Sequence, residues 1–215
     1  MKNSAPHSCN NKLAIYGGGG HGHVVLDTAF ESGIGVSFII DEDPSIRDIH
    51  GVKVIKLEKF MSLLTAKWEF VVAIGDNKSR YNIFQRLCKM GGKPISVIHP
   101  SSVCSSKSYI QGGSVVFAGV IVNSDARVQS NVILNTGSTI DHHSKIGNHV
   151  HICPGVHIAG NVEVGDFSMI GTGASVIPNI KIGRNCIVGA GAAVVSDLPD
   201  YSVSMGVPAK VVRYQ

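Results

Sequence analysis

The second half of the chain repeats an aliphatic residue at every sixth position. Each sixth residue from Ile110 to Val194 is Val, Ile or Leu. A period of six fits neither an α-helix, with about 3.6 residues per turn, nor an alternating strand, with a period of about two. It is typical of a parallel β-helix, in which every short face contributes one inward aliphatic side chain and three such faces make a coil of eighteen residues. Residues 101–215 are therefore expected to form a solenoid of stacked aliphatic rungs.

The first half of the chain alternates strand-like and helix-like segments instead. Apolar runs at 12–16, 35–40 and 70–75 are typical of buried strands. Helices are expected over 21–33, 57–64 and 78–92. Strand, helix and strand in this order indicate a parallel sheet of βαβ units. The predicted fold is thus an α/β, Rossmann-like domain over residues 1–100, followed by the β-helix over 101–215.

Composition and charge narrow the possible partners. The net charge is +4, and no Lys/Arg-rich run forms the concentrated basic face that nucleic-acid binding usually needs. No run of about 18 apolar residues is available for a membrane span. The cysteines lack a C-x-x-C pair and are typical of reduced thiols (Cys9, Cys88, Cys104, Cys153 and Cys186). A cytoplasmic protein without nucleic-acid or membrane partners is the expectation.

A glycine-rich loop follows the first expected strand. Gly17, Gly19 and Gly22 satisfy G-x-G-x-x-G, and Asp41 ends the second expected strand. Free backbone N–H groups and the helix dipole at such a loop favour phosphate. A NAD-dependent enzyme is compatible with the motif. However, the domain is too short for two mononucleotide-binding halves, and the solenoid behind it has no evident hydride chemistry.

Taken together, these features resemble a known family. The hexapeptide repeat, the segments IYGGGGHGHVV, VAIGDN and NTGSTIDHH, and the closing GVPAKVV resemble the nucleotide-sugar N-acetyltransferases of the PglD type, across Lys12 to Val212. NeuD-like sialic acid O-acetyltransferases and perosamine N-acetyltransferases are close relatives. The resemblance implies a left-handed β-helix, a homotrimer with active sites between subunits, and acetyl-CoA as the donor in glycan biosynthesis.

The activity implied by the resemblance is N-acetylation of a nucleotide-linked 4-amino-4,6-dideoxy sugar at its 4-amino group. A UDP-linked sugar is favoured on the resemblance alone. Two alternatives stay open: an O-acetyltransferase acting on sialic acid, and a non-catalytic hexapeptide scaffold that only binds a sugar nucleotide.

The resemblance also implies roles for individual residues. The expected substrate-binding residues contact the diphosphate, the sugar or the base (Gly18, Gly19, His21, Gly22, Asp41 and Asn135). His151 is expected near the acetyl group. Acetyl-CoA is expected along a groove between neighbouring subunits (Gly173, Ala174, Gly191, Pro208, Ala209 and Lys210).

Amide formation from a thioester needs a base for the amine proton and donors for the developing oxyanion. The family's base is a His between two acidic residues, and the corresponding motif here is Asp141-His142-His143. His142 is therefore the candidate base, and His143 stands where the family has an acid. An eighteen-residue coil places Gly160 directly over His142, with an exposed backbone N–H. Gly160, which matches the family's acetyl-carbonyl donor, is the candidate oxyanion donor.

Two further histidines between residues 141 and 157 are assigned no catalytic role. His149 and His157 are expected to face solvent. A zinc site built from His142, His143, His149 and His151 is disfavoured, because adjacent residues of a strand point to opposite faces. No metal is expected. Direct transfer without an acyl-enzyme is expected, because no Cys or Ser lies in a recognisable nucleophile–base motif.

Overall fold

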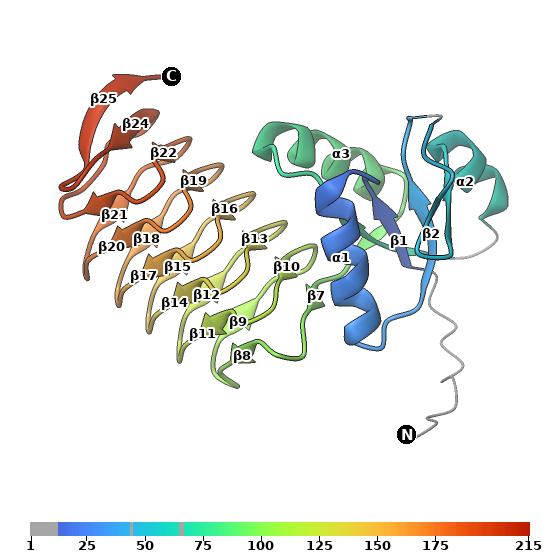
Figure 1. Cartoon of the computed structure of the whole chain (residues 1–215), viewed down its shortest axis with the longest axis horizontal. Coiled ribbons are helices and arrows are strands. Elements are labelled where there is room, and N and C mark those ends of the chain that lie inside the picture. The colour runs from blue at the N-terminus through green and yellow to red at the C-terminus, as the bar shows by residue number, and fades with distance from the viewer. Residues whose placement is uncertain (1–12, 44, 65–66) are drawn as a thin grey trace.

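The N-terminal unit is an α/β sandwich, shown on the right of Figure 1 in the computed structural model, which describes residues 13–43, 45–64 and 67–215. Its six strands are ordered β3 (Asp48–Ile49), β4 (Val52–Ile55), β2 (Val36–Ile40), β1 (Leu13–Tyr16), β5 (Glu69–Val72) and β6 (Lys93–Pro94). Neighbouring strands are parallel except in the β3–β4 hairpin. The predicted βαβ order is confirmed, whereas this hairpin was not expected from the sequence.

Helices cover both faces of the sheet because the strand residues are apolar on both sides. Helix α1 (Gly20–Glu31) packs with Leu13 and Ile15 of β1. Helices α2 (Leu57–Leu63) and α3 (Asn77–Lys89) pack with Ala14 and Tyr16, which point the other way. The loop between β1 and α1 is thereby fixed at the carboxyl edge of the sheet.

The C-terminal unit is a left-handed β-helix with three faces of short parallel strands (Figure 1). The first face contains β7 (Val97–Ile98), β10 (Val115–Val116), β13 (Ile133–Leu134), β16 (His151–Ile152), β19 (Met169–Ile170), β22 (Ile187–Val188) and β24 (Ser202–Met205), with β25 (Lys210–Tyr214) antiparallel at its edge. The second face contains β8 (Val103–Cys104), β11 (Ile121–Val122), β14 (Thr139–Ile140), β17 (His157–Ile158), β20 (Ser175–Val176) and β23 (Ala193–Val194). The third contains β9 (Tyr109–Ile110), β12 (Arg127–Val128), β15 (Lys145–Ile146), β18 (Glu163–Val164) and β21 (Lys181–Ile182).

The aliphatic rungs form the interior of this solenoid. From β7 to β23 the paired strands are eighteen residues apart, as in Val115 opposite Ile133, and the last coil is shorter, with Ile187 opposite Val203. Every rung residue from Val116 to Val194 is buried, and Ile110 is half-buried. The six-residue period is therefore confirmed as the period of the core.

Three kinds of corner join the faces. The first corner, between the first and second faces, has glycine at its left-handed position (Gly119, Gly137, Gly155, Gly173 and Gly191). The second corner, between the second and third faces, has Asp125, His143, Asn161 and Asn179 there. The third corner has Asn131, His149, Phe167 and Asn185. Asn, Asp and His are the non-glycine residues enriched in this conformation. The left-handed backbone at a corner therefore helps to set the direction in which a polar side chain at that corner points.

The two units share one apolar layer. The cluster beneath α1 continues into Val115, Phe117 and Ile133 of the β-helix. The glycine loop is consequently held above the first face. No helix among the described residues is long and apolar enough to cross a membrane. Cys9 lies outside the described residues, and the other four cysteines are free thiols.

Candidate functional site

His142 lies in the second corner, between β14 and β15. Asp141 fixes the backbone at this point, because its Oδ1 accepts hydrogen bonds from the His142 N–H (2.7 Å) and from Asn123 Nδ2 (3.0 Å). The carbonyl of His142 accepts from the N–H of Asn161 in the next coil (3.0 Å). The candidate base is therefore held by hydrogen bonds within its own coil and to both neighbouring coils.

Gly160 lies directly against the imidazole of His142. A Cβ placed on Gly160 would be 2.5 Å from Cε1 and 2.6 Å from Nε2 of that ring. Among the described residues, the Gly160 N–H donates no hydrogen bond, while its carbonyl accepts from Asn179 N (3.1 Å). The predicted stacking of Gly160 over His142 is confirmed, and it leaves a backbone donor beside a basic nitrogen.

The second nitrogen of His142 faces His143. The two Nδ1 atoms are 3.1 Å apart, and the rings meet edge to face at 82°. The expectation that these side chains point to opposite faces is wrong. They lie in a corner turn rather than in a strand, and His143 has a left-handed φ of 60° that brings its ring back toward His142.

A second group of polar residues lies on the first face, beneath the glycine loop. His151 Nδ1 is 3.3 Å from the carbonyl oxygen of Gly75, and its Nε2 is 3.3 Å from Asn135 Nδ2. Because a carbonyl only accepts, Nδ1 carries the proton and Nε2 accepts from the amide. Burial, with the charges of Arg80 and His21, lowers the pKa of His151 to about 4. His151 is thus a neutral, oriented imidazole near pH 7.

His21 approaches this group from the first turn of α1. Its ring centroid is 5.3 Å from that of Phe117 and 6.4 Å from that of His151. Burial and the charge of Arg80 lower its pKa to about 4. Among the described residues, its buried Nε2 has no hydrogen-bond partner. His21 therefore faces the junction of the two units rather than solvent.

Arg80 is buried at this junction, and no motif in the sequence indicates that it has a role there. It is 1% exposed and donates to five backbone carbonyl oxygens and to Asn77 Oδ1. Some of these acceptors belong to the turn after β5 and others to the third corner (Ile74, Gly75, Asn131, His149 and Val150). An arginine within a helix is usually solvated, so only the tertiary structure reveals this role.

The structure confirms the predicted solvent exposure for one of His149 and His157 but not for the other. His157 is exposed, as expected, and its Nδ1 is 3.0 Å from Thr139 Oγ1. His149 is 6% exposed, so its predicted solvent exposure is wrong. Helix α3 covers the third corner, and the His149 ring packs against Tyr81 and Phe84. Within the described ranges, no group of three or more His, Cys, Asp or Glu side chains is arranged to hold a metal.

The glycine loop forms a compact turn at the start of α1. Gly18 N–H donates to Asp41 Oδ2 (2.6 Å), and Gly17 adopts a φ of 113°. A Cβ at Gly22 would collide with the Gly17 carbonyl. Gly19 is the N-cap of α1, so the N–H groups of the first turn stay available. The structure thus brings Gly18, Gly19, Gly22 and Asp41 together.

The residues expected to bind acetyl-CoA gather near the first corner at the C-terminal end. Gly173 and Gly191 occupy its left-handed position in successive coils, whereas the Ala174 side chain is buried in the core. The turn between β24 and β25 carries Pro208, and Ala209 N–H anchors it to the Ala193 carbonyl (2.8 Å). Lys210, which follows, is exposed.

The candidates for catalysis and for contact with the acetyl group lie in two separate places on a single chain. His142, His143 and Gly160 belong to the second corner, while His151 belongs to the first face, which lies opposite that corner. Each face is several residues wide at a rise of about 3.3 Å per residue, so His142 and His151 are separated by ~10 Å or more. Reacting groups need a separation of about 3 to 3.5 Å. A single chain therefore does not assemble the complete set.

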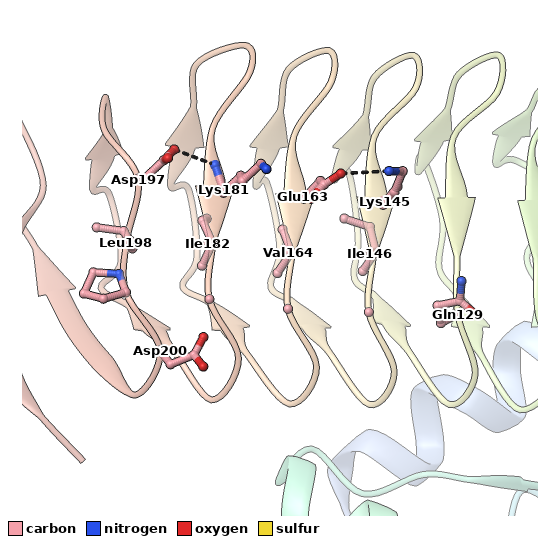
Figure 2. Close-up of a pocket in the computed structure, with 14 residues that line it drawn as sticks. Gln129, Lys145, Ile146, Glu163, Val164, Lys181, Ile182, Asp197, Leu198 and Asp200 are labelled. Carbon is pink, nitrogen blue, oxygen red and sulfur yellow. Dashed lines mark hydrogen bonds and ion pairs between the residues drawn. The ribbon is translucent and has the colours of Figure 1, made fainter.

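A groove of about 680 Å³ runs along the third face and contains none of these candidates (Figure 2). Acidic and basic side chains alternate along it. Lys145 pairs with Glu163 at 2.8 Å, and Asp197 Oδ1 accepts from the Lys181 backbone N–H at 2.8 Å. The alternating charges partly neutralise one another, which gives this groove little to attract an anionic substrate.

Each of the two units matches a known protein family. Residues 12–87 match the PglD N-terminal domain, and residues 143–176 and 161–195 match the bacterial transferase hexapeptide family (six repeats).

Solved structures with a similar fold cover nearly the whole chain. The acetyltransferase domain of PglB from Neisseria gonorrhoeae, in complex with acetyl coenzyme A, is 36% identical with a TM-score of 0.89, over 95% of this chain and 100% of that one. PerB from Caulobacter crescentus, in complex with CoA and GDP-perosamine, is 36% identical with a TM-score of 0.89, over 95% of this chain and 99% of that one. WeeI from Acinetobacter baumannii, at 24% identity and a TM-score of 0.88, shares the fold over 94% of this chain and 100% of that one. The chain belongs to the PglD-like sugar acetyltransferases with a hexapeptide-repeat β-helix.

Proposed function

We propose that this protein transfers the acetyl group of acetyl-CoA to the 4-amino group of a nucleotide-linked 4-amino-4,6-dideoxy sugar. The observation that carries the proposal is the placement of the bare Gly160 against the His142 imidazole. A basic nitrogen and a free backbone donor are the two groups that amide formation from a thioester requires. The similarity to PglB bound to acetyl-CoA and to PerB bound to GDP-perosamine supports both substrates.

In the proposed reaction, the sugar amine attacks the thioester carbonyl while His142 Nε2 takes one amine proton. The Gly160 N–H donates to the oxyanion of the tetrahedral intermediate. Collapse of this intermediate breaks the C–S bond, and His142 returns the proton to the CoA thiolate. One amide and one free thiol result. A histidine of perosamine N-acetyltransferase was replaced by Asn and by Ala in structures with CoA and GDP-perosamine, which supports a functional histidine in this family.

Several candidate residues are proposed to bind the sugar nucleotide. The free N–H groups at the start of α1 suit the diphosphate, and Asp41, which accepts from the Gly18 N–H, is proposed to contact the base. The unpartnered Nε2 of His21 is available to the sugar. A UDP-linked sugar is proposed, with GDP- and dTDP-linked sugars as the competing substrates.

We also propose that the active site forms between copies of the chain in a homotrimer. Support comes from the separation between the second corner, with His142, and the first face, with His151. A neighbouring copy that presents its first face and first corner to His142 completes the set. Acetyl-CoA is proposed to lie in the groove formed in this way, with Lys210 near a phosphate.

A substrate panel tests the reaction. The protein is incubated with acetyl-CoA and UDP-, GDP- or dTDP-linked 4-amino sugars, each beside its 4-hydroxyl analogue and beside sialic acid, while free thiol is measured. Thiol release only with an amino sugar is expected. Release with sialic acid or a hydroxyl analogue contradicts N-acetylation, and nucleotide-sugar binding without any release supports a non-catalytic scaffold.

Substitution of the proposed base is the second test. His142→Ala should lower kcat by about 10²- to 10⁴-fold, the usual contribution of a positioned base. The matched control is His157→Ala, because His157 is an exposed histidine of the second face with no assigned role. Equal activity of the two variants contradicts the role of His142.

A further inference from the structure

The group that holds the His142 ring is another imidazole. His142 Nδ1 is 3.1 Å from His143 Nδ1. Oδ1 of the nearby Asp141 accepts from the His142 backbone N–H and from Asn123 Nδ2, and among the described residues no hydrogen bond joins Asp141 to the His142 ring. Among the described residues, His143 is the hydrogen-bond partner of the His142 ring.

The chemistry of the two facing nitrogens restricts their protonation. A hydrogen bond between them requires that one carries a proton and the other does not. A base acting through Nε2 needs a free lone pair there, so in neutral His142 the proton must be on Nδ1. We propose that His143 is a positioning residue that accepts this Nδ1–H and thereby fixes the reactive tautomer of His142.

This proposal rests on the proposed role of His142 as the base. His143 Nδ1 then stays unprotonated, and His143 Nε2 carries its proton. When His142 takes the amine proton, it becomes an imidazolium that still donates from Nδ1 to His143. No proton passes to His143 during turnover. The two histidines thus work as a donor–acceptor pair.

The backbone explains why His143 can reach this position. Its left-handed conformation repeats that of Asn161 and Asn179 in the following coils, and its N–H donates to the Ser124 carbonyl at 3.2 Å. His143 also lines a groove beside the third face together with two acidic and two basic residues (Asp125, Arg127, Lys145 and Glu163).

Two variants of His143 separate hydrogen bonding from backbone effects. His143→Gly removes the acceptor and tolerates the left-handed φ, whereas His143→Asn retains a side-chain acceptor, Oδ1, at the δ position. His143→Gly should lower kcat roughly 10- to 100-fold with KM for both substrates within about twofold, and His143→Asn should retain kcat within about threefold. Added imidazole should restore part of the His143→Gly activity. Asn179→Gly, at the same corner position, is the control and should leave kcat unchanged.

Nitrogen NMR of the histidine rings measures the tautomer of His142, which would not change if His143 had a merely structural role. Neutral His142 should be an Nδ1–H tautomer in the wild type and in His143→Asn, and should lose this preference in His143→Gly. An Nε2–H tautomer of His142 in the wild type, or full kcat in His143→Gly, overturns the pairing. Because His142→Ala is assayed in parallel, loss of activity there together with full activity of His143→Gly refutes only the role of His143. Full activity of His142→Ala refutes the base itself.

Discussion

Nη2 of Arg80 donates a 2.7 Å hydrogen bond to the carbonyl oxygen of His149, across the junction between the α/β unit and the β-helix. Nη1 of the same side chain donates to Gly75, whose carbonyl also accepts from His151 Nδ1. One guanidinium therefore links the turn after β5 to the third corner and, through Gly75, to the orientation of His151. These hydrogen bonds, together with the shared apolar layer, fix the α/β unit relative to the solenoid.

Replacing Arg80 should destabilise the protein strongly. Arg80→Met leaves buried carbonyl oxygens without donors, and we expect a loss of roughly 3 to 5 kcal/mol of unfolding free energy. The measurement is thermal or urea-induced unfolding. Arg86→Met is the matched control, because Arg86 is an exposed residue of the same helix and should change stability by about 0.5 kcal/mol or less. Equal melting temperatures for the two variants contradict the role of Arg80 as a link.

Gly160→Ala should impair catalysis while the chain still folds. The new methyl group meets the His142 ring at about 2.5 Å, so the ring must move away. A displacement of about 1 Å at a reacting group can cost about 10²-fold in rate, and we expect a loss of this size in kcat. Gly35→Ala is the control, since a Cβ there meets nothing within 4 Å. Unchanged kcat in Gly160→Ala argues against contact between this position and the reacting groups.

Mixing two inactive variants should restore activity if the site forms between subunits. In oligomers co-expressed from His142→Ala and His151→Ala chains, about one site in four combines an intact His142 with an intact His151 of the neighbour. We therefore expect about a quarter of wild-type kcat in the purified mixed oligomer, measured by thiol release. Mixed oligomers as inactive as their parents contradict a shared site.

The protein should lose stability as the pH falls from 6.5 to about 4. Burial, followed by the charge of Arg80, lowers the pKa of His21, His149 and His151 to about 4, from a reference value of 6.5. In this window the unfolded chain binds protons that the folded chain does not, so the unfolding free energy falls as the pH falls. The stability is fully present above pH 6.5.

Melting temperatures measured across this range check the prediction. Because His149 is buried against aromatic rings, His149→Gln should weaken the dependence between pH 5 and 6.5, whereas His157→Gln, at an exposed position, should not. A melting temperature that stays constant between pH 6.5 and 4.5 contradicts the burial of these rings.

The sequence predicts the architecture well because its physical causes are local and periodic. Aliphatic residues at every sixth position are buried together when the chain winds into a three-faced solenoid. The residues from Ile110 to Val194 therefore predict this solenoid and its eighteen-residue coil. The same period places Gly160 over His142, and the structure confirms it. Gly17 and Gly22 of the segment from β1 to α1 indicate the tight turn, because a Cβ at either position would collide with a backbone carbonyl.

Only the tertiary structure decides which side chains meet outside the solenoid core. The corner conformation turns His143 toward His142, whereas the alternation of an ideal strand predicts the opposite. Helix α3 covers the third corner, so His149 is buried and Arg80 finds its acceptors on distant segments. These contacts join residues about 50 to 70 positions apart, and their energy depends on desolvation and on exact hydrogen-bond partners, which no local pattern encodes.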